Sequence, residues 1–465
     1  MEPVLFKTEN GNCYLYSPVV KELLPIPDSL FCEVKNKGTS NSSLWHSLHE
    51  TGYMAASESL LDAYIDYIDI DSALKSLSQI VFETTTSCNL RCEYCCYGEG
   101  YTTFDSRRNK KGNLEFETAK AILDFIDDIF AKEPITDSPS EPFAISFYGG
   151  EPLANFDVIK KIVEYAEGLA FNNRKIFFTM TTNATLLAKY SPFLREHKFK
   201  VLISLDGNRR HNRYRKSSEG KETFDLVMSN LKQVKSLYPD WFETFRFNSV
   251  FTNISDVKEI VSWFKSTFNK VPNFSPLHKP TEGSQDYNKI VSMLSKFEVP
   301  QELANDVDVA IQSPLYKRIF EVLNHLFSNV LYKESNLLND EQHHLATGTC
   351  VPFSKRMFVS YTGELHPCEK VNRDTPLGFA KNGKVVIDTE KVASIFMAKI
   401  NEAKVICENC YLQECCTKCI FCYSDGKCDS FTNKEAFAKL LSQTFSFIES
   451  NPDVVSLLEN NIIIK

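Results

Sequence analysis

Strand-like and helix-like hydrophobic patterns alternate between residue 79 and about residue 280. The strand-like segments read IVFETTT, FAISFYG, IFFTMTT, KVLISLDG, TFRFNSVFTN and a weaker VPNFSPL. The stretches between them, such as FETAKAILDFIDDIFAK and FDVIKKIVEYAEGLA, repeat apolar residues at spacings of three and four, which predicts amphipathic helices. Six such units predict an α/β fold with a partial (β/α)6 TIM-like barrel over residues 79–282. Ligands of such a barrel gather at the carboxyl ends of its strands.

The residues before the barrel form a separate N-terminal module, residues 1–75. Its first segment, VLFKTENGNCYLYSP, predicts two strands joined at the tight-turn pair Asn10-Gly11. Two helices are expected after them, at Ser43–Glu50 and Glu58–Tyr67.

Three regions follow the barrel. Residues 283–345 are helical and polar and predict a bridge. Residues 346–432 are rich in cysteine and contain two short strands, RMFVSYTG and VVIDTE. Residues 433–465 contain a closing amphipathic helix at Lys434–Ser450.

Length and charge narrow the class of protein. A chain of 465 residues is expected to form two or three domains. The net charge of −8, from 52 basic and 60 acidic side chains, argues against a nucleic-acid partner. The N-terminus does not have the layout of a signal peptide and no apolar run approaches membrane-spanning length, so a cytoplasmic protein without a membrane partner is expected. In a reducing cytoplasm the 15 cysteines are interpreted as metal ligands rather than disulfides.

Three cysteines lie close together after the first barrel strand. Cys88, Cys92 and Cys95 stand in SCNLRCEYCCYGEG with the spacing Cys-x3-Cys-x2-Cys. Three thiolates this close can bind three irons of a [4Fe–4S] cube and leave the fourth iron open to another ligand. Structural zinc sites usually present two cysteine pairs separated by a longer loop, and zinc is the alternative. Cys96 is interpreted as a buried or incidental thiol, because it cannot easily point at the cluster that Cys95 binds.

A glycine-glutamate turn follows the second barrel strand. In Gly149-Gly150-Glu151 the two glycines let a ligand approach the backbone, and the Glu151 carboxylate is an acceptor for an ammonium group. Such a turn would hold a zwitterionic amino acid across the strand edge. The alternative is a simple strand-to-helix turn.

The cysteine triplet and this turn together resemble the radical S-adenosylmethionine (radical SAM) enzymes. The cluster motif of that family has an aromatic residue before the third cysteine, here Tyr94, and its Gly-Gly-Glu-Pro segment binds the methionine amino group of S-adenosylmethionine (SAM). Asn183 ends the third strand in Thr-Thr-Asn, where the family commonly has Thr-Asn-Gly and this chain has Ala184. The resemblance covers about residues 79–430, with the motifs in the family's order.

The resemblance implies further SAM contacts. Ser204, in Ser-Leu-Asp-Gly at the fourth strand's end, would contact the ribose, and Asp206 belongs to the same motif. His-Asn-Arg-Tyr-Arg then resembles the family's His-Asp-x-x-Arg after a loop that is one residue short. Arg215, or else Arg213, would therefore grip the SAM carboxylate with its planar fork. The adenosine pocket would be lined from the fifth strand's end by Asn248 and Val250.

The cysteines near the C-terminus resemble the SPASM domain, an appendage of radical SAM enzymes that carries auxiliary iron–sulfur clusters. The first half of the pattern is Cys350-x12-Gly363-x4-Cys368. The second half, CENCYLQECCTKCIFCYSDGKC, is one residue shorter than is usual in that domain. By the family's wiring the inner cluster would take Cys350, Cys368 and Cys419. The outer cluster would take Cys407, Cys410, either Cys415 or Cys416, and Cys428, with Cys422 as the alternative last ligand.

The inner cluster is short of one cysteine by this wiring. No cysteine lies between residues 97 and 349, so an open iron or a non-cysteine ligand is expected. His343 and His344 are candidates, although a pair of surface imidazoles is the simpler interpretation. A zinc ribbon of Cys407, Cys410, Cys416 and Cys419 is a further alternative, which leaves Cys350 and Cys368 without a role.

The resemblance implies a peptide maturase that uses SAM, a [4Fe–4S] cluster and two auxiliary iron–sulfur clusters, expected to be [4Fe–4S]. A 5′-deoxyadenosyl radical would take a hydrogen from a ribosomally made precursor peptide, and flavodoxin or ferredoxin would supply electrons. The N-terminal module is similar to winged-helix elements that bind leader peptides, and a domain that merely packs on the barrel is its alternative. Cross-linking is the expected reaction, because its net oxidation gives the auxiliary clusters an electron to accept.

Three other functions stay open. An anaerobic sulfatase maturase, which converts Cys or Ser to formylglycine, shares the barrel and the SPASM domain but would not need a 75-residue front module. Peptide epimerisation needs the same radical chemistry. A catalytically idle peptide-binding scaffold would not need the intact cysteine triplet. The sequence does not identify a catalytic base.

Overall fold

The computed structural model describes two compact units. The first comprises residues 1–65, 315–350 and 394–465, and the second comprises residues 66–314 and 351–393. Within them the described residues are 1–20, 22–56, 65–101, 111–132, 142–295, 309, 349–369, 371, 373, 375–412, 416, 418–422, 426–428 and 430–452. Cys415, His343, His344, most of the predicted helix Glu58–Tyr67 and most of the predicted bridge 283–345 lie outside this part of the chain.

The second unit is built on a ten-stranded sheet with the order β13-β12-β11-β10-β4-β5-β6-β7-β8-β9. Its six central strands run parallel and in chain order, which confirms the predicted partial barrel. These strands are β4 (Gln79–Thr85), β5 (Phe143–Gly149), β6 (Ile176–Thr182), β7 (Lys200–Ser204), β8 (Arg246–Phe251) and β9 (Asn273–Pro276).

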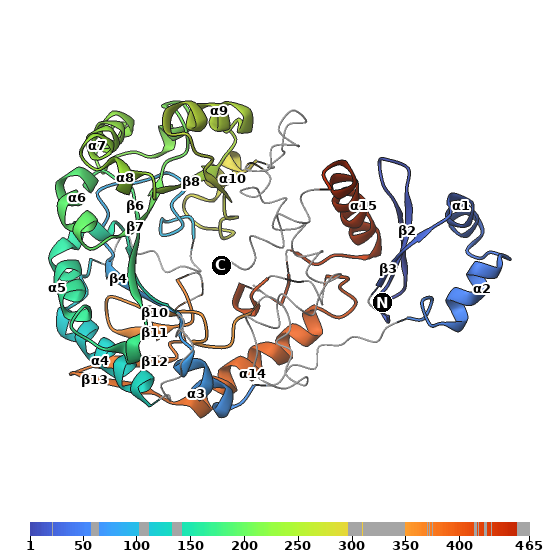
Figure 1. Ribbon diagram of the computed structural model, residues 1–465, viewed down its shortest axis with the longest axis horizontal. Helices are drawn as coiled ribbons and strands as arrows, with labels where there is room; N and C mark the ends of the chain where they lie inside the picture. The colour runs from blue at the N-terminus through green and yellow to red at the C-terminus, as the bar shows by residue number, and fades with distance from the viewer. Residues whose placement is uncertain are drawn as a thin grey trace. The chain divides into compact units, whose positions relative to one another are not determined.

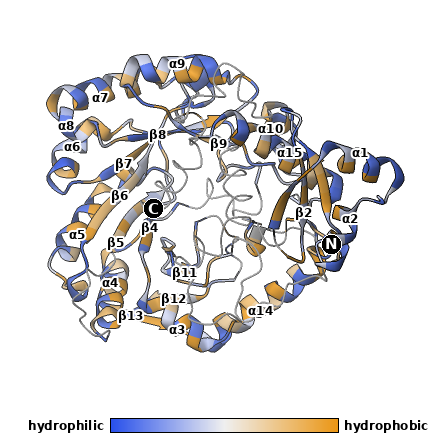
Figure 2. Ribbon diagram, turned by 45° about the vertical axis from the view of Figure 1, so that its right-hand side comes forward, coloured by the Kyte–Doolittle hydropathy of each residue, from blue (hydrophilic) through white to orange (hydrophobic). Residues whose placement is uncertain are grey.

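Helices cover the outer face of this curved sheet (Figure 1). They are α4 (Phe116–Ala131), α5 (Phe156–Ala166), α6 (Leu187–Glu196), α7 (Phe224–Leu237), α8 (Pro239–Phe242) and α9 (Val257–Phe268), with α3 (Tyr67–Lys75) before and α10 (Tyr287–Met293) after them. On α5 the buried residues recur at helical spacing, from Val158 and Ile159 to Ile162, Val163 and Ala166. Hydrophobic and hydrophilic segments accordingly alternate along these helices (Figure 2).

Four short strands extend the sheet beyond β4. Strand β10 (Met357–Val359) pairs in parallel with β4, and β11 (Glu364–His366), β12 (Gly378–Lys381) and β13 (Lys384–Ile387) continue antiparallel. Residues 351–393, the first half of the predicted cysteine-rich domain, are therefore part of the same compact unit as the barrel strands. Helix α14 (Thr389–Ile406) follows them.

The first unit contains a three-stranded antiparallel sheet of β1 (Val4–Lys7), β2 (Cys13–Ser17) and β3 (Glu22–Ile26). One face packs against α1 (Asp28–Lys37) and α2 (Ser43–Glu50), and the other packs against α15 (Lys434–Ser450) through Phe6, Tyr16, Phe437 and Leu441. Strand β3 and α1 were not predicted. Pro25 argues against a strand in the sequence, and the structure tolerates it because β3 lies at an edge of the sheet.

Helix α3 belongs to the second unit. The first unit's N-terminal segment ends at Ile65, and α3 lies against α4 in the second unit. Among the described helices, none combines the length and the apolar composition that crossing a membrane requires.

Candidate functional site

The cysteine loop, residues 88–95, begins three residues after β4 ends and is fixed by a second loop. Its backbone pairs with residues 214–218, which follow β7. Arg91 donates a backbone hydrogen bond to Lys216 at 2.7 Å, and Glu93 donates one to Tyr214 at 3.0 Å. The segment that contains Arg215 therefore lies alongside the cysteine loop.

The three cysteines of this loop differ in exposure, and burial of the Cys88 thiol raises its pKa. Cys88 is exposed, and Cys92 and Cys95 are half-buried. The backbone N–H of Leu90 points at the Cys88 sulfur at 3.3 Å. Within the described part of the chain, no three His, Cys, Asp or Glu side chains converge on the position of a single metal ion. The donor set of three thiols on one loop is the one that a cube with an open iron takes.

The glycine-glutamate turn lies directly against the strand end that leads into the cysteine loop. Gly150 and Glu151 donate backbone hydrogen bonds to the carbonyls of Thr85 and Ser87 at 2.8 and 2.9 Å. Gly149 has a φ of +142°, and a Cβ there would lie 2.3 Å from the Thr85 oxygen. A Cβ on Gly150 would lie 2.2 Å from the Ser87 oxygen. The glycines are thus required for the approach of two backbone segments, whereas the sequence was interpreted as making room for a ligand.

We expect Gly150→Ala to destabilise the protein and to loosen iron binding. The added methyl group would meet backbone atoms, which cannot rotate away, so the strand end before the cysteine loop must shift. Overpacking of this kind costs about 1–3 kcal/mol. Urea denaturation and the iron content of the reconstituted protein measure the two effects. Gly168→Ala is the matched control, because its methyl group would meet the nearest atom at an ordinary 3.4 Å; equal losses in both variants would contradict the prediction.

The Glu151 carboxylate is held inside the protein. It is 1% exposed and accepts hydrogen bonds from the Thr182 hydroxyl at 2.6 Å and from the backbone N–H groups of Asn183 and Leu153 at 2.8 and 3.2 Å. Burial raises the pKa of Glu151 to about 7, and these hydrogen bonds oppose the rise. Its oxygens join the end of β5 to the end of β6. That this carboxylate accepts a ligand's ammonium group stays a prediction.

Asn183, at the end of β6, reaches the cysteine loop as the sequence predicts for a site residue. Its amide nitrogen donates to the Asn89 side-chain oxygen at 3.0 Å and lies 3.8 Å from the Cys88 sulfur. Its side-chain oxygen accepts from the Thr185 hydroxyl at 2.6 Å. Ala184 has a φ of +61°, a conformation that glycine adopts more easily, at the position where the family has glycine.

Asp206 and Arg215 form a buried ion pair beside Tyr94. Arg215 donates through Nε and Nη2 to the two carboxylate oxygens at 3.0 and 2.9 Å. The Tyr94 hydroxyl and the Val250 backbone N–H also donate to this carboxylate. The charge of Asp206 keeps the pKa of Arg215 well above its usual range despite burial. The Nε and Nη2 edge of the Arg215 guanidinium is therefore occupied by Asp206. This edge is not free to bind the SAM carboxylate, as was expected of Arg215.

The other candidate positions lie at neighbouring strand ends. Ser204 on β7 and Asn248 on β8 are register partners and are half-buried. Val250 packs beside Tyr94 and Cys92. Arg213, the alternative to Arg215, is exposed and donates to the Tyr214 hydroxyl at 3.2 Å. Arg215, and not Arg213, is thus the arginine that points toward the cysteine loop.

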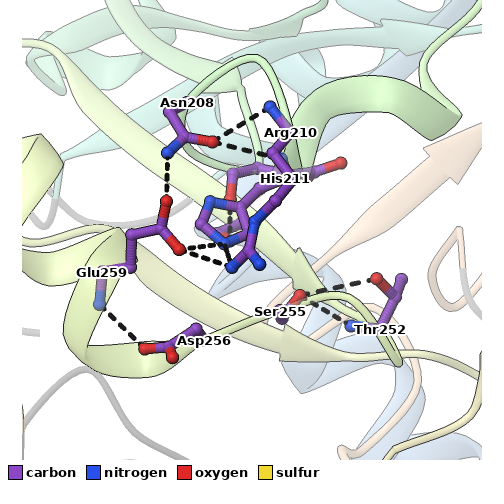
Figure 3. A network of polar contacts seen from close by, with 9 residues as sticks. Asn208, Arg210, His211, Thr252, Ser255, Asp256 and Glu259 are labelled. Atoms are coloured by element: carbon purple, nitrogen blue, oxygen red, sulfur yellow. Dashed lines mark hydrogen bonds and ion pairs between the residues drawn. The ribbon is translucent and has the colours of Figure 1, made fainter.

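The residues just before Arg215 are anchored to α9 by a polar network (Figure 3). Glu259 accepts hydrogen bonds from Asn208 at 2.6 Å and from Arg210, and its carboxylate lies 3.5 Å from His211 Nε2. Burial lowers the pKa of His211. Asp256 caps α9 by accepting from the Glu259 backbone N–H at 2.9 Å. This network fixes the segment that pairs with the cysteine loop.

Four C-terminal cysteines come together in the first unit. Cys407 and Cys410 are buried, and the Cys410 N–H donates to the Cys407 carbonyl at 3.0 Å. Burial raises the pKa of the Cys416 thiol to about 12, and the thiols of Cys407, Cys410 and Cys428 raise it further. All four are among the cysteines expected for the outer cluster, and Cys415, the alternative to Cys416, lies outside the described residues. Cys422 closes a short 3-10 helix, Ile420–Cys422.

The cysteines expected for the inner cluster fall on both units. In the first unit, the Ile420 N–H donates to the Thr349 hydroxyl at 2.9 Å, so the residue after Cys419 lies beside the residue before Cys350. Cys368 is in the second unit, two residues after β11, and is half-buried.

Several residues of the site were not predicted. Asn89 and Thr185 complete the chain of hydrogen bonds around Asn183, and Thr182 holds Glu151. The Asn89–Thr185 contact joins residues 96 positions apart in the sequence, and the Thr182–Glu151 contact joins residues 31 positions apart. The hydrophobic pattern carried no signal for them, because these contacts form at strand ends and in loops whose conformation only the fold determines.

Comparison with known proteins shows what the barrel part of this chain is similar to. Residues 82–264 match the family model described as the Radical SAM superfamily. A cysteine-type anaerobic sulfatase-maturating enzyme of Clostridium novyi (strain NT) is 29% identical over 163 residues, which is 34% of this chain and 40% of the relative. The enzyme with the same description from Clostridium perfringens (strain ATCC 13124) is 26% identical over 309 residues, which is 63% of this chain and 74% of the relative.

Two further comparisons extend the picture. The radical SAM cyclopropyl synthase TigE of Paramaledivibacter caminithermalis is 24% identical over 173 residues, which is 37% of this chain and 35% of the relative. The solved structure of native anSMEcpe with bound AdoMet and Cp18Cys peptide matches with a TM-score of 0.52 at 22% identity, covering 83% of this chain and 99% of that chain. The structural likeness supports the fold.

Proposed function

We propose, from the radical SAM domain that residues 82–264 form, that this chain uses SAM and a [4Fe–4S] cluster to modify a peptide or protein side chain. The observation that carries the proposal is the cysteine loop, which presents Cys88, Cys92 and Cys95 at the carboxyl edge of the parallel sheet and beside the Gly149-Gly150 turn. Three thiols fit the cluster as its donor set. When bound, the cluster supplies the electron that cleaves SAM, and the protein orients both groups.

The residues of the chain have separable tasks in this proposal. The Gly149-Gly150 turn and the end of β6 at Asn183 would bind the methionine part of SAM. Ser204 and Val250 would line the nucleoside part, since both are half-buried at adjacent strand ends. Arg215 would hold the Asp206 carboxylate, and with it Tyr94 and the cysteine loop, in position.

We further assign the chain to peptide maturation by cross-linking. The N-terminal sheet with its two helices precedes the barrel, as a recognition module for a leader peptide would, and β3 lies at an edge of that sheet, where an extended peptide can add as a strand. A relative named as a radical SAM cyclopropyl synthase also supports a bond-forming reaction. The auxiliary clusters expected from the C-terminal cysteines would accept the electron that bond closure releases.

The precursor experiment tests this function. We expect the anaerobically reconstituted protein, given SAM, a reductant and a precursor peptide from its own gene neighbourhood, to form 5′-deoxyadenosine and a peptide lighter by two hydrogens. High-resolution mass spectrometry measures the peptide. An unchanged mass with deuterium incorporated from solvent would replace cross-linking by epimerisation. Absence of deoxyadenosine in the iron-loaded protein would contradict the enzyme assignment.

Leader binding has its own test. Addition of a strand at β3 uses the backbone N–H and C=O groups of the peptide. A leader peptide that is N-methylated at alternate residues is therefore expected to bind at least about tenfold more weakly. Each 1.4 kcal/mol of lost hydrogen bonding lowers the affinity by a factor of about ten. Fluorescence anisotropy with the full chain measures the dissociation constant. The same peptide methylated at the complementary set of residues is the matched control. Equal affinities for all three peptides would exclude strand addition.

Sulfatase maturation is the second candidate, because two of the relatives are named as cysteine-type anaerobic sulfatase-maturating enzymes. Its product carries an aldehyde, whereas a cross-linked peptide does not. An aldehyde-reactive hydroxylamine added to the product therefore separates the two functions. A labelled product would favour formylglycine formation even where the peptide also loses two hydrogens.

A further inference from the structure

His366, the last residue of β11, is fully buried, and neither of its ring nitrogens has a hydrogen-bond partner in the structure of the described residues. The Glu364 carboxylate lies 3.7 Å from Nε2, which is beyond hydrogen-bond distance. Buried polar side chains are nearly always hydrogen-bonded, because burial removes the water that would otherwise bind them. The imidazole therefore lies at a position where a partner other than the described polypeptide is expected.

The strand register shows which face of the sheet His366 occupies. It stands opposite Phe358 of β10, and Phe358 is in register with Val81 of β4, which is in register with Ser146 of β5. Register partners share a face of the sheet. This face is polar, with the Gln79 amide donating to the Ser146 hydroxyl at 2.7 Å. It also borders a cavity of about 100 Å³ that is lined by, among others, Gln79, Ser146, Tyr148, Arg356 and Glu369.

A second buried donor on this face is also unpaired. Arg373 places its guanidinium 4.6 Å above the Phe358 ring and binds the buried Glu83 carboxylate through Nη1 at 2.7 Å. Its Nη2 is buried and, among the described residues, has no acceptor. Two donor groups that flank the same phenyl ring thus both lack a partner. A single missing group on this face would account for both, because both side chains lie beside the Phe358 ring.

Cys368 indicates what that group is. It follows His366 by two residues, and it is the only cysteine of the second unit that is expected to bind an auxiliary cluster. The expected inner set contains three cysteines, and the sequence has no further cysteine between residues 97 and 349. Imidazole replaces thiolate on iron in Rieske centres, so it is a competent ligand of iron–sulfur clusters.

We propose that His366 ligates an iron of the auxiliary cluster that Cys368 binds. This inference rests on the auxiliary clusters of the proposed function. A neutral imidazole in place of a thiolate removes one negative charge from the cluster, which raises its reduction potential. A higher potential suits the acceptance of the electron that a cross-linking reaction releases. Arg373 Nη2 is a donor in position to stabilise the added electron.

Pulsed electron paramagnetic resonance of the reduced auxiliary iron tests the ligand directly. A Cys88→Ala/Cys92→Ala/Cys95→Ala variant of the full chain removes the SAM cluster, so the remaining signal comes from auxiliary clusters alone. We expect strong ¹⁴N coupling in this variant, replaced by ¹⁵N coupling when the protein is made with ¹⁵N-histidine. His366→Ala in the same background should abolish the coupling. His366→Cys should keep the iron content, abolish the coupling and lower the reduction potential.

His211→Ala is the matched control, because His211 is likewise buried with an unpaired ring nitrogen but no expected cluster ligand adjoins it. This variant should leave the ¹⁴N coupling unchanged. Coupling that survives His366→Ala would assign the ligand to another histidine and overturn the inference. Auxiliary iron without any nitrogen coupling would also overturn it while leaving the proposed function intact. A triple-cysteine variant that takes up no iron or sulfide would instead refute the auxiliary clusters of the proposed function.

Discussion

Replacing Cys88 with alanine is expected to reduce deoxyadenosine formation from SAM to the background rate. The cysteine loop supplies three thiols, and a cube that loses one of them exposes a second iron and is no longer held in one orientation. The Cys88 sulfur also receives the Leu90 N–H at 3.3 Å and lies 3.8 Å from the Asn183 amide, so its place in the loop is defined by two donors. Anaerobic assay of deoxyadenosine by chromatography, together with iron and sulfide analysis, measures the loss.

Cys96→Ala is the matched control for that experiment. Cys96 is adjacent to the third thiol of the loop and is half-buried, but it is not one of the three expected ligands. The variant should keep the iron of the SAM cluster and its rate of SAM cleavage. Loss of activity in Cys96→Ala with activity retained in Cys88→Ala would contradict the assignment of the ligands. A Cys88→Ser variant with partial iron content would support it, because the hydroxyl is a weaker ligand in the same place.

The barrel could be predicted from the sequence because short stretches of the chain show its strands and helices. Each strand from β4 to β8 is an apolar run, each following helix repeats apolar residues at helical spacing, and a parallel sheet in chain order needs no further information. The candidate residues at the strand ends follow from this order. Asn183 and Cys88 meet because β4 and β6 flank β5, which the alternation already implies.

The roles of two side chains could not be predicted, because they depend on tertiary partners. Glu151 reads as a free acceptor in Gly-Gly-Glu-Pro, yet the fold surrounds it with three donors from β6 and its own turn. Arg215 reads as an anion-binding fork, yet Asp206, nine residues earlier, occupies one edge of it. The carboxylate and the guanidinium thus both have partners within the fold. Sequence motifs singled out these two positions, whereas the partner of each charge is a property of the fold.

Asp206 is expected to be the most sensitive of these joints. Its carboxylate is 1% exposed and accepts from Arg215 twice, from the Tyr94 hydroxyl and from the Val250 N–H. Removing one partner of a buried ion pair leaves the other charge uncompensated, which costs about 3–5 kcal/mol. Asp206→Ala should therefore lower the free energy of unfolding by this amount, measured by urea denaturation. Iron binding should fall as well, because Tyr94 belongs to the cysteine loop.

The double variant Asp206→Leu/Arg215→Met separates charge burial from loop positioning. Exchange of a buried ion pair for apolar side chains of similar size is often neutral for stability, so the double variant should recover most of the loss in Asp206→Ala. The Tyr94 hydroxyl would still lack its acceptor, and SAM cleavage should therefore stay low in a protein of restored stability. A double variant as active as the parent would show that the ion pair serves stability alone. One as unstable as Asp206→Ala would show that the Val250 and Tyr94 hydrogen bonds, rather than the unpaired arginine, dominate the cost. The expected combination of restored stability and lost activity identifies Asp206 as a positioning residue of the cluster loop.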